Sequence, residues 1–151
     1  MLNRFVIFLL FIPTLVIATS MIALATYSAY LVDNNNGTIH DLVTGLIWQK
    51  SEGDSMRWDD AISYCDELRL TEKKDWRLPN INELRSLVDG SLFNPALDRV
   101  KFPEVRASLY WSSTTSSSRN EFAWFVSFML GNANSYKKNQ SYFVRCVRGG
   151  Y

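Results

Sequence analysis

The sequence predicts an α+β domain with two helices, several β-strands and one disulfide that joins distant parts of the chain. Two segments with apolar residues at helical spacing predict the helices. Alternating segments in the last third predict strands, and the only two cysteines predict the disulfide. With 151 residues, 47% hydrophobic and 21% charged, the chain has the composition of an ordinary globular protein with one domain.

Residues 1–25 have the pattern of a targeting segment. Residues 5–25 carry no charge and are dominated by Phe, Leu, Ile, Val and Ala. Ala23 and Ala25 match the small-residue pattern of a signal-peptide cleavage site, here before Thr26. About 20 apolar residues also suffice to span a bilayer, so an uncleaved N-terminal anchor is the alternative. In both cases we expect export, to the periplasm, the outer surface or the medium, with membrane contact only through the uncleaved segment.

The charge balance argues against nucleic acid as a partner. Cleavage removes Arg4 and no other charged residue, so the number of Lys and Arg falls from 16 to 15, equal to the 15 Asp and Glu. A nucleic-acid binder normally carries an excess of Lys and Arg, which displaces counterions from phosphates. The charges are unevenly distributed, because residues 33–75 are mainly acidic. The residues after Glu121 include no acid and four bases, Lys137, Lys138, Arg145 and Arg148.

The globular domain is expected to cover residues 38–151, after a polar linker over residues 26–37. Residues 38–48 have two β-prone arms around a turn that ends at Gly45, which predicts a hairpin. The next predicted element is a helix with acidic residues on its outer faces. Its apolar face consists of Trp58, Ala61, Ile62, Cys65 and Leu68.

A second helix is predicted to begin after Asn80, a favourable N-cap that is followed three residues later by Glu83. Residues 92–107 have two prolines and no clean period, which predicts an irregular connection. The alternating pattern then predicts strands over residues 109–113, 122–130 and 142–147, with a turn at Gly131-Asn132 between the last two.

The two cysteines are expected to form a disulfide that joins the last strand to the first helix. Cys65 and Cys146 lack the C-x-x-C spacing of redox and zinc sites, and export favours oxidation. In the chain-entropy model, closing a loop of roughly 80 residues stabilises the fold by about 4.5 kcal/mol. A disulfide of this span therefore matters for a domain of this size.

Several short motifs resemble those of one protein family. They are Thr44-Gly-Leu-Ile-Trp48, Trp58, Cys65, Asp75-Trp-Arg-Leu-Pro-Asn80, Tyr110-Trp-Ser-Ser113, Trp124 and Val144-Arg-Cys-Val-Arg-Gly-Gly150. In this order they resemble the C-terminal domain of the Legionella collagen-like adhesins. The resemblance implies a C-type-lectin-like fold, with two helices packed on a mixed, mainly antiparallel sheet, that is related also to sulfatase-modifying factors. It also implies adhesion at a cell surface. A collagen-like stalk is not expected here, because the chain has only 7 glycines and no G-x-y repeat.

The sequence indicates no catalytic site, metal site or cofactor. His40 is the only histidine, and a catalytic role would need it beside an acid such as Asp41 or Asp75. The cysteine chemistry of the sulfatase-modifying relatives is not expected, because a disulfide would use both cysteines. Residues 33–37 resemble a calcium loop, but their glycine is misplaced and no Glu closes the pattern.

Two groups of residues are candidates for ligand binding. Trp111, with Ser113 among the hydroxyl residues that follow it, would offer an aromatic platform for a sugar ring; the alternatives are a core tryptophan and a flexible serine-rich loop. The second group, the basic block, would bind sulfate or carboxylate groups. The alternatives for the block are charges that protect an edge strand and arginines that pair with the acidic N-terminal half. The basic block consists of Lys137, Lys138, Arg145 and Arg148.

The leading hypothesis is therefore an exported, lectin-like binding domain that recognises an extracellular anionic polysaccharide or surface protein without catalysis. The second hypothesis is a structural or assembly module of the cell envelope, which packs against a partner or against itself as an oligomer. An enzyme with an unrecognised site is the third.

Overall fold

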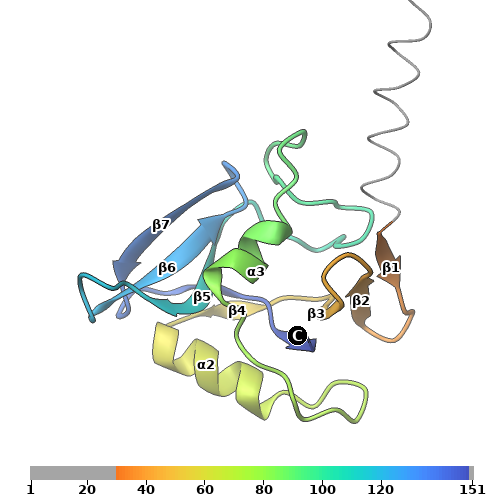
Figure 1. Ribbon diagram of the computed structural model, residues 1–151, viewed down its shortest axis with the longest axis horizontal. Helices are drawn as coiled ribbons and strands as arrows, with labels where there is room; N and C mark the ends of the chain where they lie inside the picture. Colours follow the sequence, from red (N-terminus) through yellow and green to blue (C-terminus); the bar gives the residue numbers. More distant parts are fainter. Residues whose placement is uncertain (1–29, 150–151) are drawn as a thin grey trace, which may run out of the picture.

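Two sheets and two helices make up the part of the protein that the structure describes, residues 30–149 of a computed structural model (Figure 1). The predicted signal peptide or anchor, residues 1–25, lies outside the described residues. Within residues 30–149, no helix is long and apolar enough to cross a lipid bilayer. The predicted α+β class with two helices and one disulfide is confirmed, and the strands are divided between two sheets rather than one.

The first sheet is antiparallel throughout, with the strand order β1-β2-β3-β9. Its strands are β1 (Leu31–Asp33), β2 (Thr38–Asp41), β3 (Leu46–Gln49) and β9 (Val147–Gly149). Strands β2 and β3 form the predicted hairpin, whose turn ends at Gly45 with a φ of 70°. Strand β1 falls inside the predicted linker, so the folded part begins earlier than expected. A three-residue strand beside an Asn-rich turn is too short to show a period in the sequence.

The second sheet is mixed, with the strand order β4-β8-β5-β6-β7. Its strands are β4 (Gly53–Met56), β5 (Leu109–Thr115), β6 (Phe122–Ser127), β7 (Asn132–Lys137) and β8 (Tyr142–Val144). Only the pair β5 and β8 is parallel. Strand β7 was not predicted, because its polar sequence Asn-Ala-Asn-Ser-Tyr-Lys lacks the β-branched residues typical of strands. The Gly131 turn therefore joins β6 to β7.

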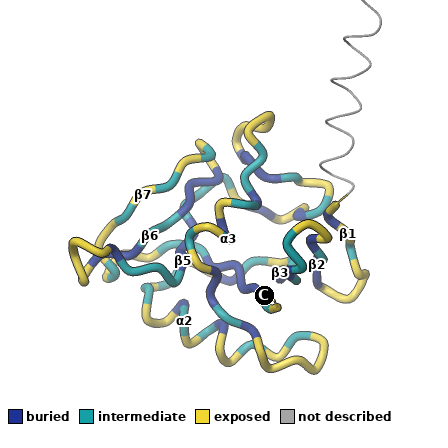
Figure 2. Tube along the Cα trace, in the orientation of Figure 1, coloured by how far each residue is buried: buried dark blue, intermediate teal, exposed yellow. Residues whose placement is uncertain are grey.

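The two helices cover opposite faces of the second sheet. Both α2 (Trp58–Glu67) and α3 (Ile81–Ser86) match the predicted helices. The predicted capping box begins α3: the Asn80 side chain accepts from the backbone N–H of Glu83, whose carboxylate accepts from the N–H of Asn80. Tyr110 and Trp111 are consecutive in β5 and point to opposite faces. Tyr110 packs with the α3 cluster and Trp111 with the α2 cluster. Figure 2 shows that the buried stretches of the chain run through the middle of the molecule, whereas the outer loops are exposed.

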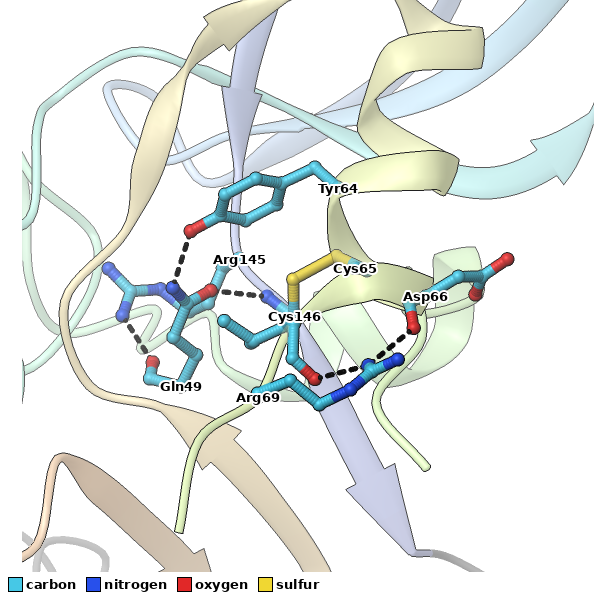
Figure 3. Close-up of a disulfide and its surroundings, with 8 residues drawn as sticks. Gln49, Tyr64, Cys65, Asp66, Arg69, Arg145 and Cys146 are labelled. Carbon is cyan, nitrogen blue, oxygen red and sulfur yellow. Dashed lines mark hydrogen bonds between the residues drawn. A yellow bond between two sulfur atoms is a disulfide. The ribbon is translucent and has the colours of Figure 1, made fainter. Parts of the chain in front are cut away.

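The chain crosses from one sheet to the other along two adjacent paths. One path runs from β3 to β4, and the other from β8 to β9. The predicted last strand, residues 142–147, is thus broken after Val144, and its two parts belong to different sheets. At the break, Cys146 forms the predicted disulfide with Cys65 of α2 (Figure 3). The backbone N–H of Gln49 donates to the carbonyl of Cys146 at 3.0 Å, which ties the two paths together.

Candidate ligand-binding site

Arg145 of the predicted basic block lies in the interior. Its side chain has no exposed surface, so the expectation that it binds a ligand is wrong. Its Nη1 donates to the backbone carbonyls of Gln49 at 2.8 Å and Lys50 at 2.6 Å, and its guanidinium lies over the ring of Phe102. Figure 3 shows the side chain turned toward Gln49 at the crossing of the two paths. The alternation of residues along a continuous strand did not predict that the Arg145 side chain is buried, because the strand is broken at Arg145.

Glu52 is the acidic partner of Arg145. Its carboxylate lies 3.2 Å from Arg145 Nη2 and accepts a hydrogen bond from the Tyr110 hydroxyl. Burial, reinforced by the Glu52 carboxylate, raises the pKa of Tyr110, which keeps the phenol protonated. Burial lowers the pKa of Arg145, and the neighbouring Tyr110 and Glu52 oppose that effect. The exposed Arg106 approaches the other carboxylate oxygen at 3.2 Å. These groups are partners of one another and leave no open site for a ligand.

Arg148 is held by an acid of the N-terminal half. Its guanidinium forms a two-pronged contact with Asp75, at 2.8 Å from Nε and 2.9 Å from Nη2. The hydrogen bonds from Arg148 hold the pKa of the Asp75 carboxyl below its usual range. Arg148 lies on β9 in the first sheet, whereas Lys137 ends β7 at the edge of the second. The basic block is therefore not one surface, and its arginines pair with the acidic half, as one alternative predicted.

Trp111 is fully buried, so its predicted use as an exposed sugar platform is wrong. Its indole N–H donates to the carbonyl of Met56 at 3.1 Å, and its ring packs 4.3 Å from that of Tyr142. Ser113 is half-buried within β5, where its backbone N–H donates to the carbonyl of Pro79 at 2.8 Å. The serine-rich segment is thus partly a strand, and it does not present Trp111 to solvent.

Lys137 and Lys138 contribute to a different site, which we call the cationic depression. It is a shallow, open hollow of about 340 Å³, lined by Arg57, Glu121, Lys137, Lys138 and Asn139. Three segments that are distant in sequence meet here: the start of α2, the loop before β6 and the turn after β7. In Figure 1 they meet at the left end of the second sheet, far from β1. Three cations against one carboxylate leave a formal charge of about +2 within the depression.

Backbone hydrogen bonds hold the three segments together. The N–H of Trp58 donates to the carbonyl of Lys138 at 3.1 Å, and the N–H of Lys138 donates to the carbonyl of Glu121 at 2.9 Å. The Lys138 ammonium lies 3.8 Å from the centroid of the Trp58 ring, a cation–π contact. The Trp58 indole N–H donates to the carbonyl of Ser112 at 2.8 Å, which fixes the ring. The fixed Trp58 ring therefore holds the Lys138 ammonium in place through this cation–π contact.

Arg57 and Glu121 were not identified from the sequence. They lie far apart along the chain and far from Lys137, and neither belongs to a motif with a spacing that indicates a site. Only the tertiary fold brings them together, through the bonds that Lys138 makes to both flanking segments. The one local signal is that Arg57 directly precedes the predicted helix, and an Arg at that place does not by itself indicate a ligand.

The acids that a catalytic His40 would need are bound elsewhere. The Asp41 carboxylate accepts from the N–H groups of Val43 and Thr44 and from the Thr44 hydroxyl, which closes the hairpin turn. Asp75 pairs with Arg148. Within residues 30–149, no hydrogen bond joins either acid to His40. In the same region, no three His, Cys, Asp or Glu side chains gather in a way that could hold a metal ion.

Comparison with known proteins identifies the family. No curated protein matches the chain significantly. The family model described as the Lcl C-terminal domain matches residues 37–148, most of the part that the structure describes. The motifs that carry the resemblance build the fold: Asn80 caps α3, Cys146 forms the disulfide, and Arg148 binds Asp75. The chain therefore belongs to the Lcl C-terminal domain family.

Proposed function

We propose that this protein is an exported, lectin-like binding domain that holds a sulfated or carboxylated glycan at the cationic depression and catalyses no reaction. The main support for this proposal is that three cationic residues line one open hollow, namely Arg57, Lys137 and Lys138. Neither lysine has an acidic side chain as a salt-bridge partner within residues 30–149. Their charges are therefore available to a ligand, unlike those of Arg145 and Arg148.

The shape of the depression favours a polymer over a small molecule. An open hollow excludes little water, so each contact between a surface charge and an anion contributes only about 0.2–1 kcal/mol. Useful affinity then requires several contacts at once, which repeated sulfate or carboxylate groups along one chain supply. Arg57 can form forked contacts with such groups, whereas the lysines act as point charges.

The test is binding of the full chain, solubilised in mild detergent, to dextran sulfate and to unsulfated dextran. The two polymers share a backbone, so any difference reports the sulfate groups. We expect binding to dextran sulfate alone, and binding that weakens from about 0.1 M to 1 M salt, as the screening length falls from about 10 Å to about 3 Å. Equal binding to both polymers, or binding to neither, would contradict the proposal.

Matched variants locate the site. We expect the triple variant Arg57→Gln, Lys137→Gln, Lys138→Gln to lose at least about tenfold in affinity, since three contacts of about 0.5 kcal/mol are removed. The control removes the same charge elsewhere, through Lys73→Gln, Lys74→Gln, Arg85→Gln, at exposed positions away from the depression. An equal loss in both variants would mean that net charge alone governs binding. Circular dichroism and thermal melting check that both variants are folded.

A further inference from the structure

Exposed apolar side chains gather in four short segments of the described region, which we call the apolar face. These segments are residues 30–32, 42–43, 92–100 and 129–130. The side chains of Val43, Phe93 and Val100 are 70%, 74% and 82% exposed. A concentration of exposed apolar side chains of this kind often marks an interaction site. Tyr136 is the only other large apolar side chain that is exposed among residues 30–149.

Hydrogen bonds join the four segments in two pairs. The N–H of Leu42 donates to the carbonyl of Tyr30 at 2.9 Å, and Tyr30 and Val43 both line a cavity of about 90 Å³. The N–H of Ala96 donates to the carbonyl of Phe128 at 2.7 Å, which joins the loop over residues 92–100 to the turn after β6. In Figure 1, this loop and this turn lie on the upper side, where the described chain begins at β1.

The sequence that precedes β1 indicates what the apolar face contacts. Five residues, Thr-Tyr-Ser-Ala-Tyr over positions 26–30, separate the apolar run of residues 5–25 from Leu31. Five residues span at most about 18 Å. Two of the five are tyrosines, which are enriched where a membrane segment meets water. If residues 5–25 stay in a bilayer, so short a connection keeps the start of β1, and the apolar face beside it, at the bilayer surface.

We propose that residues 5–25 remain attached as a transmembrane anchor and that the apolar face lies in the interfacial layer of the same bilayer. Phe93 and Val100 are the most exposed members and enter the headgroup region, while Arg99 between them reaches the lipid phosphates. The cationic depression lies at the far end of the second sheet from β1, away from the place where the anchor joins the domain.

The experiment places a fluorescent label on the full chain in phosphatidylcholine–phosphatidylglycerol liposomes that contain a nitroxide-labelled lipid. Labels are attached at Phe93→Cys and Val100→Cys, and at Asn139→Cys in the depression as the matched exposed control. Mass spectrometry confirms that the native disulfide is intact in each variant. We expect quenching at positions 93 and 100 at least twofold stronger than at 139. Equal, weak quenching at all three positions would overturn the proposal.

Two further outcomes would also overturn it. Intact mass of the protein from the exporting cell would show a chain that begins at Thr26 if the segment is removed, whereas we expect residues 5–25 to be retained. Disulfide cross-linking between two copies of Phe93→Cys, without quenching by lipid, would mean that the apolar face is an interface between copies.

The triple variant Val43→Ser, Phe93→Ser, Val100→Ser should lower the quenching of a label at Met129→Cys without unfolding the domain.

Discussion

Arg145 donates from Nη1 to the backbone carbonyl of Gln49 at 2.8 Å, at the point where the chain crosses between the two sheets. Gln49 in turn accepts the N–H of Cys146 on its side-chain oxygen at 3.1 Å and donates from its amide to Tyr64 of α2 at 2.8 Å (Figure 3). This contact makes Arg145 a structural residue. Arg145 therefore serves the sheet junction rather than an open site.

Replacing Arg145 should destabilise the protein strongly. Arg145→Met leaves the Glu52 carboxylate buried without its main cation and leaves two carbonyls without a donor. Breaking a buried ion pair in this way costs about 3–5 kcal/mol. Urea unfolding followed by circular dichroism measures the loss. A loss below about 1 kcal/mol would show that the junction does not depend on Arg145.

Two matched variants separate the contribution of the buried Arg145–Glu52 pair to stability from that of the more exposed Arg148–Asp75 pair. The double variant Glu52→Gln, Arg145→Met should be less destabilised than Arg145→Met alone, because no uncompensated charge remains. Arg148→Gln should cost no more than about 1 kcal/mol, because its partner Asp75 is largely exposed to solvent.

Loss of the disulfide should lower the free energy of unfolding by at most about 4.5 kcal/mol, from the 81-residue separation of its cysteines. The double variant Cys65→Ser, Cys146→Ser and the wild type in dithiothreitol should show the same lowered urea midpoint. The oxidised protein should contain no reactive thiol, since the chain has only two cysteines. An unchanged midpoint would contradict a stabilising role.

Stability should fall in acid, partly through Glu83. Burial opposes ionisation of the Glu83 carboxyl, but hydrogen bonds from Arg77 and from the N–H of Asn80 outweigh it and lower its pKa. A lowered pKa means stability that is complete above the ordinary carboxyl range and is lost as pH falls below about 4. Glu83→Gln should cost about 1–2 kcal/mol at pH 7 and reduce the loss in acid. An unchanged acid profile in the variant would exclude Glu83 as a cause.

Glu121→Gln should strengthen binding of dextran sulfate. The carboxylate lies in the cationic depression and repels an anionic ligand, and removal of one surface charge there changes the affinity by about two- to fivefold. Isothermal titration at low salt measures the change, with Glu104→Gln as the exposed control away from the depression. Weaker binding by Glu121→Gln would instead indicate that the carboxylate contacts the ligand.

The helices and the hairpin could be predicted because each leaves a local pattern, and the disulfide because the chain has only two cysteines. The capping box from Asn80 to Glu83 and the apolar spacing around Cys65 are examples. Strand β7 could not be predicted, because an edge strand needs no apolar face. The break after Val144 also has no local signal, since nothing in the sequence shows that Arg145 binds carbonyls almost 100 positions earlier.

The candidate site could be predicted only in part. A run of basic residues near the C-terminus identified Lys137 and Lys138 as candidates, but sequence proximity grouped them with two arginines that serve the fold. Arg57 and Glu121 join the lysines only because Lys138 is bonded to the segments on both sides. The charge pattern of a sequence can predict that a site is basic. Which residues form the site depends on long-range contacts in the fold.

The central claim is that ligand binds at the cationic depression and not at the motif arginines. Nuclear magnetic resonance of the ¹⁵N-labelled full chain in detergent micelles, titrated with a short sulfated dextran, tests it most directly. We predict that the largest amide shifts occur at Arg57, Lys137 and Lys138, with little change at Asp75 and Arg148. Shifts centred on Asp75 and Arg148, with none at the depression, would contradict the account.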